Sequence, residues 1–243
     1  MARILTLTLN PALDLTVSLD TLTLGAVNRS LGLTRHAAGK GLNVAQVLTD
    51  LGHSLTVSGF LGVDNAAPFE ALFATRGMHD GFIRVPGETR SNIKLVEADG
   101  RVTDINGQGP EVDEAARSAL LRCLAQVAPG HDAVVVAGSL PRGISADWFR
   151  QLLEQLKAQG LKVALDSSGE ALRAGLQSSP WLVKPNTEEL GEVLGLAVDN
   201  PAQQRAAAER LLASGVEHVV VSAGEQGVSW FTHGHAVHAC PPK

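Results

Sequence analysis

Short runs of apolar, β-branched residues alternate with amphipathic stretches through the second half of the chain. We expect strands at residues 133–137, 162–166, 181–184 and 216–222. We expect helices between them at residues 147–159, 187–194 and 201–214. The strands are apolar at successive positions, which is typical of strands that are covered on both faces. The pattern therefore predicts an α/β/α sandwich with a mostly parallel central sheet.

The first part of the chain starts with the same pattern and then departs from it twice. We expect its first core elements to be strands at residues 4–9 and 55–60 and a helix at residues 41–51. Residues 12–35 and 88–106 instead alternate polar and apolar positions, as strands do when one face of a sheet meets solvent. An Asp99-Gly100 turn predicts a hairpin in the second segment. We therefore expect a small β lid over one end of the sandwich, within a single domain of residues 1–243.

Composition and charge narrow the class of protein. The 243 residues are 44% hydrophobic and 19% charged, which is enough to bury a substantial core. The net charge of −5 and the scattered cations disfavour nucleic acid as a partner, because such binding needs clustered Lys and Arg. No apolar stretch approaches the ~18 residues that cross a bilayer, and no signal peptide is recognisable, so we expect a cytoplasmic protein without a membrane partner. Cys123 and Cys240 are too few for a disulfide framework, and we expect two reduced thiols.

Small residues stand immediately before the first predicted helix, at Ala38, Gly39 and Gly41 around Lys40. Backbone without Cβ atoms can approach a ligand closely, and the N–H groups of a helix N-terminus favour an anion. Lys40 adds a full charge, and Asn43 can donate to and accept from sugar hydroxyls. The turn therefore predicts an oxyanion or sugar site; the alternative is that its glycines serve chain reversal alone. A P-loop is excluded, because Gly41 follows Lys40 where that motif requires Ser or Thr.

Two segments near the start of the chain form a recognisable pair, Asn10-Pro11-Ala12-Leu13-Asp14 and Gly39-Lys40-Gly41-Leu42-Asn43-Val44-Ala45. Further segments follow in order at residues 89–94, 138–141, 166–169, 184–189 and 222–227. Together they resemble the ribokinase-like (phosphofructokinase B type) carbohydrate kinases, above all the signatures of 1-phosphofructokinases and tagatose-6-phosphate kinases. The resemblance implies a ribokinase-like three-layer α/β/α sandwich with a mostly parallel central sheet and a small β lid.

The resemblance also implies a site for a small phosphosugar. Its expected residues are Asp14, Gly39, Lys40, Gly41, Asn43, Arg90 and Ser139. Asp14 would hold sugar hydroxyls, and the alternative is an Asx turn after Pro11. Arg90 would pair with the phosphate already on the sugar, because a guanidinium presents parallel donors to phosphate oxygens. Ser139 follows a predicted parallel strand, at the edge of the sheet where ligands bind.

ATP and Mg²⁺ are the cofactors that the resemblance implies. Asn186 and Glu189 match an Asn-x-x-Glu pair that organises magnesium and nucleotide phosphates, with Glu189 as an indirect magnesium ligand, and Lys184 lies just before them. Taken alone, the pair is equally typical of a helix N-cap followed by Glu in the first turn. The expected nucleotide-binding loop consists of Ser222, Ala223, Gly224, Glu225, Gln226 and Gly227. A hairpin between the flanking strands is its structural alternative, and both interpretations can hold together.

One part of the family pattern is not found in the sequence. Similar kinases carry a Gly-Ala-Gly-Asp motif after the position that corresponds to Lys243; its Asp is the general base, and its N–H groups bind the transferring phosphoryl group. We therefore expect no catalytic base among residues 1–243, a general base beyond Lys243, and a chain that is truncated at its C-terminus.

The expected reaction is the ATP-dependent phosphorylation of fructose 1-phosphate to fructose 1,6-bisphosphate. The motifs position a phosphosugar without fixing which one, so tagatose 6-phosphate and fructose 6-phosphate are alternative substrates. If the truncation is genuine, a non-catalytic sugar-phosphate-binding protein is the alternative function. The exposed edge of the lid around residues 93–105 also predicts a homodimer that forms through the lid.

Overall fold

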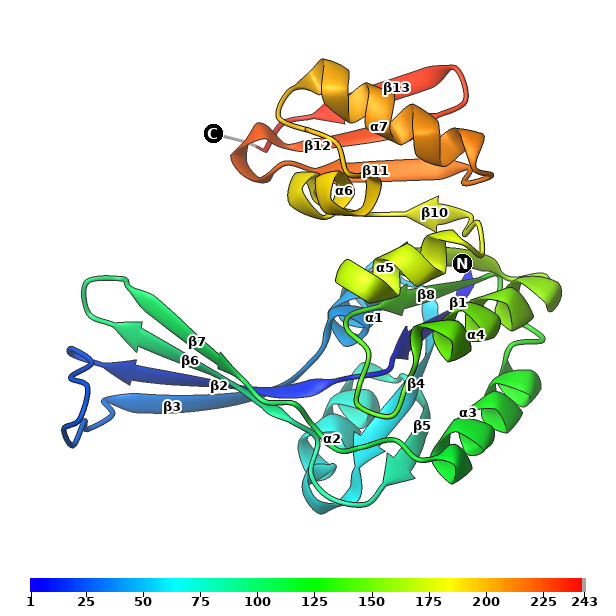
Figure 1. Ribbon diagram of the computed structural model, residues 1–243. Helices are drawn as coiled ribbons and strands as arrows, with labels where there is room; N and C mark the ends of the chain where they lie inside the picture. Colours follow the sequence, from blue (N-terminus) through cyan, green and yellow to red (C-terminus); the bar gives the residue numbers. More distant parts are fainter. Residues whose placement is uncertain (242–243) are drawn as a thin grey trace.

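A large sheet and a small sheet organise the chain, which a computed structural model describes over residues 1–241 (Figure 1). Within these residues the large sheet contains β1 (Arg3–Thr8), β4 (Ser54–Gly62), β5 (His79–Val85), β8 (Ala133–Ala137), β9 (Lys162–Asp166), β10 (Leu182–Val183), β11 (His218–Ser222), β12 (Val228–Thr232) and β13 (His235–Ala239). Their order across the sheet is β13-β12-β11-β10-β9-β8-β1-β4-β5. All neighbours from β5 to β11 are parallel, and only β12 and β13 add antiparallel pairs. The mostly parallel sheet is therefore confirmed.

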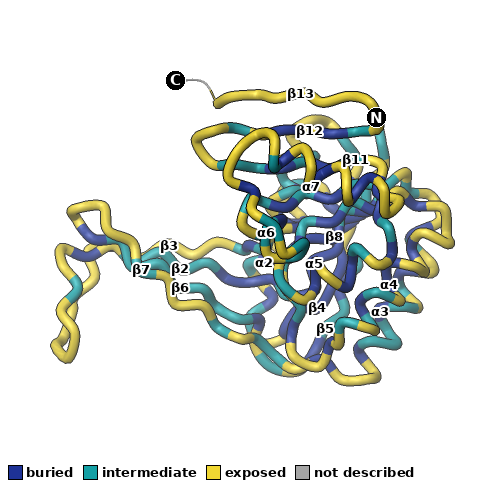
Figure 2. The backbone as a smooth tube through the Cα atoms, turned by 45° about the horizontal axis from the view of Figure 1, so that its top comes forward, coloured by how far each residue is buried: buried dark blue, intermediate teal, exposed yellow. Residues whose placement is uncertain are grey.

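Helices cover both faces of this sheet. On one face lie α1 (Lys40–Asp50) and α2 (Ala67–Arg76), whose buried side chains form a core with those of β4 and β5. On the other face lie α3 (Glu114–Val127), α4 (Ala146–Ala158), α5 (Gly169–Leu176), α6 (Thr187–Leu194) and α7 (Pro201–Ala213), over a larger core. Single 3₁₀ turns occur at Val63–Asn65 and Gly224–Gln226. The central strands β1 and β4 are buried over most of their length, as expected for a sheet between two layers of helices (Figure 2).

The second sheet is a β lid that projects from the end of the sandwich (Figure 1). Its strands are β2 (Ala12–Leu19), β3 (Gly32–Ala38), β6 (Ser91–Glu97) and β7 (Val102–Asn106), in the order β3-β2-β6-β7. The pairs β2–β3 and β6–β7 are antiparallel hairpins, and β2 runs parallel to β6. Most lid residues are exposed or half-buried (Figure 2). The predicted lid is thus present, and β3 continues to Ala38, directly before the glycine turn.

Part of the large sheet is covered on one face only. The contacts of α1 and α2 with the large sheet extend from β5 to β8, so on their face the antiparallel edge of the sheet meets solvent. There Val228, Trp230 and Val237 are 37, 45 and 57% exposed. Side chains of this kind in an α/β sheet are ordinarily covered by helices, so this edge presents an apolar strip. None of the helices in residues 1–241 has both the length and the apolar character that crossing a membrane requires.

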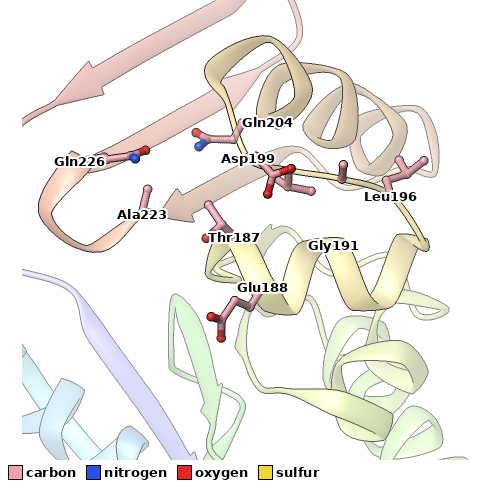
Figure 3. Close-up of a pocket in the computed structure, with 10 residues that line it drawn as sticks. Thr187, Glu188, Gly191, Leu196, Asp199, Gln204, Ala223 and Gln226 are labelled. Atoms are coloured by element: carbon pink, nitrogen blue, oxygen red, sulfur yellow. The ribbon is translucent and has the colours of Figure 1, made fainter.

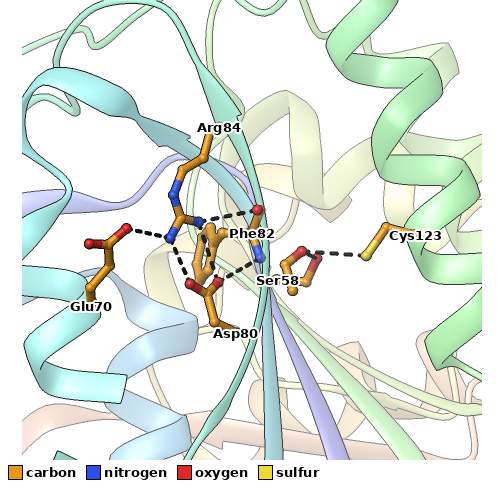
Figure 4. A network of polar contacts seen from close by, with 7 residues as sticks. Ser58, Glu70, Asp80, Phe82, Arg84 and Cys123 are labelled. Atoms are coloured by element: carbon orange, nitrogen blue, oxygen red, sulfur yellow. Dashed lines mark hydrogen bonds and ion pairs between the residues drawn. The ribbon is translucent and has the colours of Figure 1, made fainter. Parts of the chain in front are cut away.

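A polar network fixes the β5 edge of the sheet against α2 (Figure 4). Arg84 donates to Glu70 on α2 at 2.8 Å and to Asp80 on its own strand at 2.6 Å. The hydrogen bond from Arg84 to Asp80 is the main cause that raises the pKa of the guanidinium above its usual value. Cys123 on α3 contacts the carbonyl oxygen of Gly81 at 3.5 Å, and burial raises the pKa of its thiol. The Cys123 thiol therefore packs between α3 and β5.

Candidate active site

Polar residues from five strands meet at one edge of the large sheet. Asn10 follows β1 and Ser139 follows β8, while Asp166 is the last residue of β9. Lys184 follows β10 and Ser222 ends β11. All five strands are parallel, so these residues lie at their carboxyl ends, which is where open α/β sheets bind ligands. The lid arises from the same edge, because β2 begins two residues after Asn10.

The glycine turn brings Lys40 to this edge by packing closely on β1. Gly39 precedes α1 with φ of +139°, in a region that L-residues rarely adopt. A Cβ atom on Gly39 would lie 2.8 Å from the Cγ2 atom of Thr8, and one on Gly41 would overlap the Oγ1 atom of Thr8. The two glycines therefore let the start of α1 approach β1, and Lys40 becomes the first residue of the helix at the site.

Four charged side chains form a compact cluster beside the turn. The Nζ atom of Lys40 lies 3.3 Å from Asp166 Oδ1 and 3.9 Å from Glu189 Oε1. Lys184 Nζ lies 3.1 Å from the other oxygen of Asp166. The Asp166 and Glu189 side chains are only 14 and 15% exposed, whereas the lysines are far more accessible. Two cations therefore face the solvent side of the site on a base of two carboxylates, an arrangement suited to anionic ligands.

Asn186 and Glu189 form the N-cap of α6. The Asn186 side chain accepts the N–H of Glu189 at 2.7 Å, and the N–H of Asn186 donates to Glu189 Oε2 at 2.9 Å. The structural alternative from the sequence is therefore confirmed as a capping box. The cap occupies one oxygen of Glu189 and leaves Oε1 directed at Lys40. Cap and ligand site thus use different atoms of one carboxylate.

The predicted nucleotide loop lies next to this cap. Ser222 pairs with Asn186 in a parallel bridge, and its N–H donates to the carbonyl oxygen of Pro185 at 3.1 Å. Ala223 N–H donates to Gly227 at 2.8 Å, which closes the loop between β11 and the antiparallel β12. The backbone of this loop therefore forms the hairpin that the sequence allowed as an alternative.

A polar pocket of about 420 Å³ opens between the first turn of α6, this loop and the start of α7 (Figure 3). Its polar lining consists of Thr187, Glu188, Asp199, Gln204 and Gln226.

The base of the lid carries the residues expected to bind the sugar. Asn92 on β6 donates to Asp14 Oδ1 on β2 at 3.0 Å, and Asn10 donates to Ser139 Oγ at 3.1 Å. The oxygen of the Asn92 amide is buried and has no hydrogen-bond partner among the described residues. A buried acceptor of this kind calls for a hydrogen-bond donor.

Arg90 is held between the lid and β1 by backbone oxygens. Its Nε, Nη1 and Nη2 atoms donate to the carbonyl oxygens of Pro11, Gly107 and Asn10, each at 3.3 Å. Burial lowers the pKa of the Arg90 guanidinium from its usual value, and the Asp14 carboxylate partly offsets this effect. Three of its five N–H groups are used, so two remain for the predicted contact with a phosphate.

The structure brings together most, but not all, of the predicted site residues. Asn43 is exposed on α1, where its N–H donates to the carbonyl oxygen of Gly39 at 2.9 Å, and it takes no part in the ion pairs of the charged cluster. In contrast, Asn10, Asn92 and Asp166 belong to the site although the sequence assigned them no role. The signal for them was their position, since Asn10 and Asp166 stand at the ends of predicted strands.

Known proteins resemble this chain over nearly its whole length. The model of the pfkB family of carbohydrate kinases matches residues 7–243. The 1-phosphofructokinases of Vibrio cholerae and Haemophilus influenzae are 46% and 44% identical to it over 99% of this chain, which corresponds to 76% and 77% of their own lengths. Phosphofructokinase-2 from Escherichia coli, solved in complex with fructose-6-phosphate, superimposes with a TM-score of 0.90 at 29% identity, covering 100% of this chain and 80% of that chain.

Proposed function

The chain belongs to the pfkB family of carbohydrate kinases, and from this premise we propose that it transfers a phosphoryl group from ATP to fructose 1-phosphate. The products are fructose 1,6-bisphosphate and ADP. The observation that carries the proposal is the row of polar and charged groups at the carboxyl edge of the sheet. It extends from Asp14 and Asn92 at the lid base to the cluster of Lys40, Asp166 and Glu189. The identity to 1-phosphofructokinases supports fructose 1-phosphate over other phosphosugars.

The two ligands occupy the two ends of this row. Asp14, Asn92 and Arg90 at the lid base bind the sugar hydroxyls and its existing phosphate. Lys184 and the loop at residues 222–227 bind the phosphates of ATP on the other side. Lys40 lies between the ends, where the phosphoryl group passes from one ligand to the other. Because phosphoryl transfer depends chiefly on alignment and charge stabilisation, this placement is the main contribution of residues 1–241.

The cluster also fits Mg²⁺ as an indirectly bound cofactor. Glu189 Oε1 is the oxygen that the capping box leaves free, and it lies in a cluster with the carboxylate of Asp166. Mg²⁺ prefers oxygen ligands and keeps several waters, so Glu189 would hold it through water beside the ATP phosphates. When bound, the ion neutralises charge on those phosphates.

We place the general base outside residues 1–243, in a segment of the Gly-Ala-Gly-Asp type. Within the described residues, both oxygens of Asp166 are paired with lysines, and one oxygen of Asp14 accepts a hydrogen bond from Asn92. The chain end at Lys243 lies outside the described residues.

A substrate panel tests the proposed function. ADP release is measured on a chain extended beyond Lys243 to include the expected Gly-Ala-Gly-Asp segment, with fructose 1-phosphate, tagatose 6-phosphate and fructose 6-phosphate as substrates. The affinity for each sugar is measured by calorimetry. We expect turnover and the tightest binding with fructose 1-phosphate. A preference for either other sugar would favour the alternative substrates, and tight binding without ADP release would favour a sugar-phosphate-binding protein.

We propose in addition that the lid forms a homodimer. Register places the apolar side chains of Leu15, Ile93 and Ile105 side by side on one face of the lid, with Val17 and Leu95 in the next row. Asp14, Asn92 and Lys94 occupy the opposite face. An apolar face of a projecting sheet is stabilised by a second copy of itself.

Replacing Ile93 by Asp is expected to convert such a dimer to a monomer, because it places a charge at the centre of the buried face. Sedimentation velocity at micromolar concentration measures the change. Thr16→Asp adds the same charge to the opposite face of the same sheet and should leave the dimer intact. A wild-type chain that sediments as a monomer would contradict the lid dimer.

A further inference from the structure

Asp166 joins two lysines that come from distant parts of the chain. Its Oδ1 atom accepts from Lys40 on α1 and its Oδ2 atom from Lys184 after β10, at 3.3 and 3.1 Å. Lys40 follows the lid strand β3 by two residues, since β3 ends at Ala38, which pairs with Ala12 on β2. Lys184 adjoins the nucleotide end, two residues before the Asn186 cap. The Asp166 carboxylate thus connects a lysine that follows the lid to a lysine at the nucleotide end of the site.

The backbone around Asp166 is fixed more firmly than the lysines it binds. The N–H of Gly138 donates to the carbonyl oxygen of Asp166 at 2.9 Å, and the hydroxyl of Ser167 donates to the carbonyl oxygen of Gly138 at 2.9 Å. The N–H of Lys184 donates to Leu165 at 2.9 Å. Asp166 is therefore anchored on both sides within the sheet, whereas Lys40 and Lys184 are long side chains that are 48 and 41% exposed. The Asp166 carboxylate can therefore orient the two flexible lysine side chains.

Without this carboxylate the two ammonium groups would repel each other and sample many rotamers. From these contacts we propose that Asp166 is a positioning residue, which holds Lys40 and Lys184 in one orientation at the path of the transferring phosphoryl group. This inference rests on the proposed function. Glu189 cannot replace Asp166 in this role, because its Oε2 atom is used by the cap and its Oε1 atom lies 3.9 Å from Lys40 alone.

The proposed role has a kinetic signature. Asp166 repels anionic ligands by its charge, so its removal should not weaken their binding in the ground state. Misdirected lysines, however, stabilise less of the charge that develops during transfer, which lowers kcat. For Asp166→Asn, whose side chain has the same shape, we expect kcat to fall about 10- to 100-fold while the dissociation constants of ATP and fructose 1-phosphate change less than about 3-fold.

A spectroscopic measurement tests the positioning without turnover. Lysines are labelled by reductive ¹³C-methylation, which retains their charge, and Lys40→Arg and Lys184→Arg assign the two signals. In wild type these signals should be dispersed, and in Asp166→Asn both should move to the position of exposed lysines. Glu154→Gln is the control, because it removes a carboxylate from a surface pair with Arg150 on α4 and should change neither the signals nor kcat.

Each outcome decides the proposal. Signals of Lys40 and Lys184 that are unchanged in Asp166→Asn would overturn it, as would a rise in KM with kcat unchanged. A defect confined to the dependence of the rate on Mg²⁺ concentration would make Asp166 a metal ligand instead, and a loss of thermal stability together with all binding would make it a structural residue. The kinetic variants are compared in the chain extended beyond Lys243. If that extended wild type shows no turnover, the proposed function fails, and the lysine spectrum alone still decides whether Asp166 positions the two side chains.

Discussion

Replacement of Asp14 by Ala is expected to weaken the binding of fructose 1-phosphate by about 10- to 100-fold. The Asp14 carboxylate lies at the base of the lid, where Asn92 fixes one of its oxygens at 3.0 Å and leaves the other for the sugar. A hydrogen bond to a charged group contributes about 1.5–3 kcal/mol, and sugar hydroxyls donate to such an acceptor. Calorimetry with fructose 1-phosphate measures the loss, and the affinity for ATP should stay within about 3-fold of wild type.

A control for Asp14 is available at the far end of the same strand. Asp20→Ala removes the same group from an exposed position directly after β2, so it should leave sugar affinity unchanged. Equal affinities of wild type and Asp14→Ala would show that Asp14 forms a turn or lid contact only, as in the Asx-turn alternative. Loss of affinity in both variants would instead indicate a general effect of charge on the lid.

Replacement of Gly62 by Ala is expected to lower the free energy of unfolding by about 2–4 kcal/mol. Gly62 ends β4 and donates its N–H to the hydroxyl of Thr89 at 2.8 Å. A Cβ atom on Gly62 would lie 2.5 Å from the carbonyl oxygen of Gly87 and would overlap the backbone of Thr89. That segment cannot move aside, because Asn65 binds both the N–H and the carbonyl oxygen of Thr89 at 2.8 Å.

Urea denaturation of Gly62→Ala measures this loss. Gly32→Ala is the matched control, because Gly32 has no atom within 4 Å of its missing Cβ and no positive φ, so the change should stay within about 0.5 kcal/mol. Because residues 87–89 directly precede Arg90, sugar-phosphate affinity should also fall in Gly62→Ala. A stability equal to wild type would mean that the loop repacks without strain.

Local sequence patterns predicted most of the strands and helices that form the core. The strand at residues 133–137 and the helix at residues 187–194 have the predicted bounds in the structure. These elements are recognisable because a strand buried on both faces is a continuous run of apolar residues. A helix with one buried face has apolar residues at helical spacing. Strand β5 and helix α5 have weaker sequence patterns and were not predicted. β5 is an edge strand that contains the polar residues His79, Asp80 and Arg84, and α5 is only eight residues long. Helix α3 was not predicted either, although the i, i+4, i+8 spacing of Ala116, Leu120 and Leu124 is typical of a helix with one buried face.

Motif order determined the family, and with it which end of the sheet carries the site. Only the tertiary structure decided which side chains meet there. Lys40 and Asp166 are 126 positions apart, and Asp14 and Asn92 are 78 apart. Each pair forms because parallel crossovers return distant strands to the same edge, and no local pattern encodes that distance. The sequence by itself therefore determined the chemistry of the residues and the layers they build, while the bridge from Asp166 to two lysines required the folded sheet.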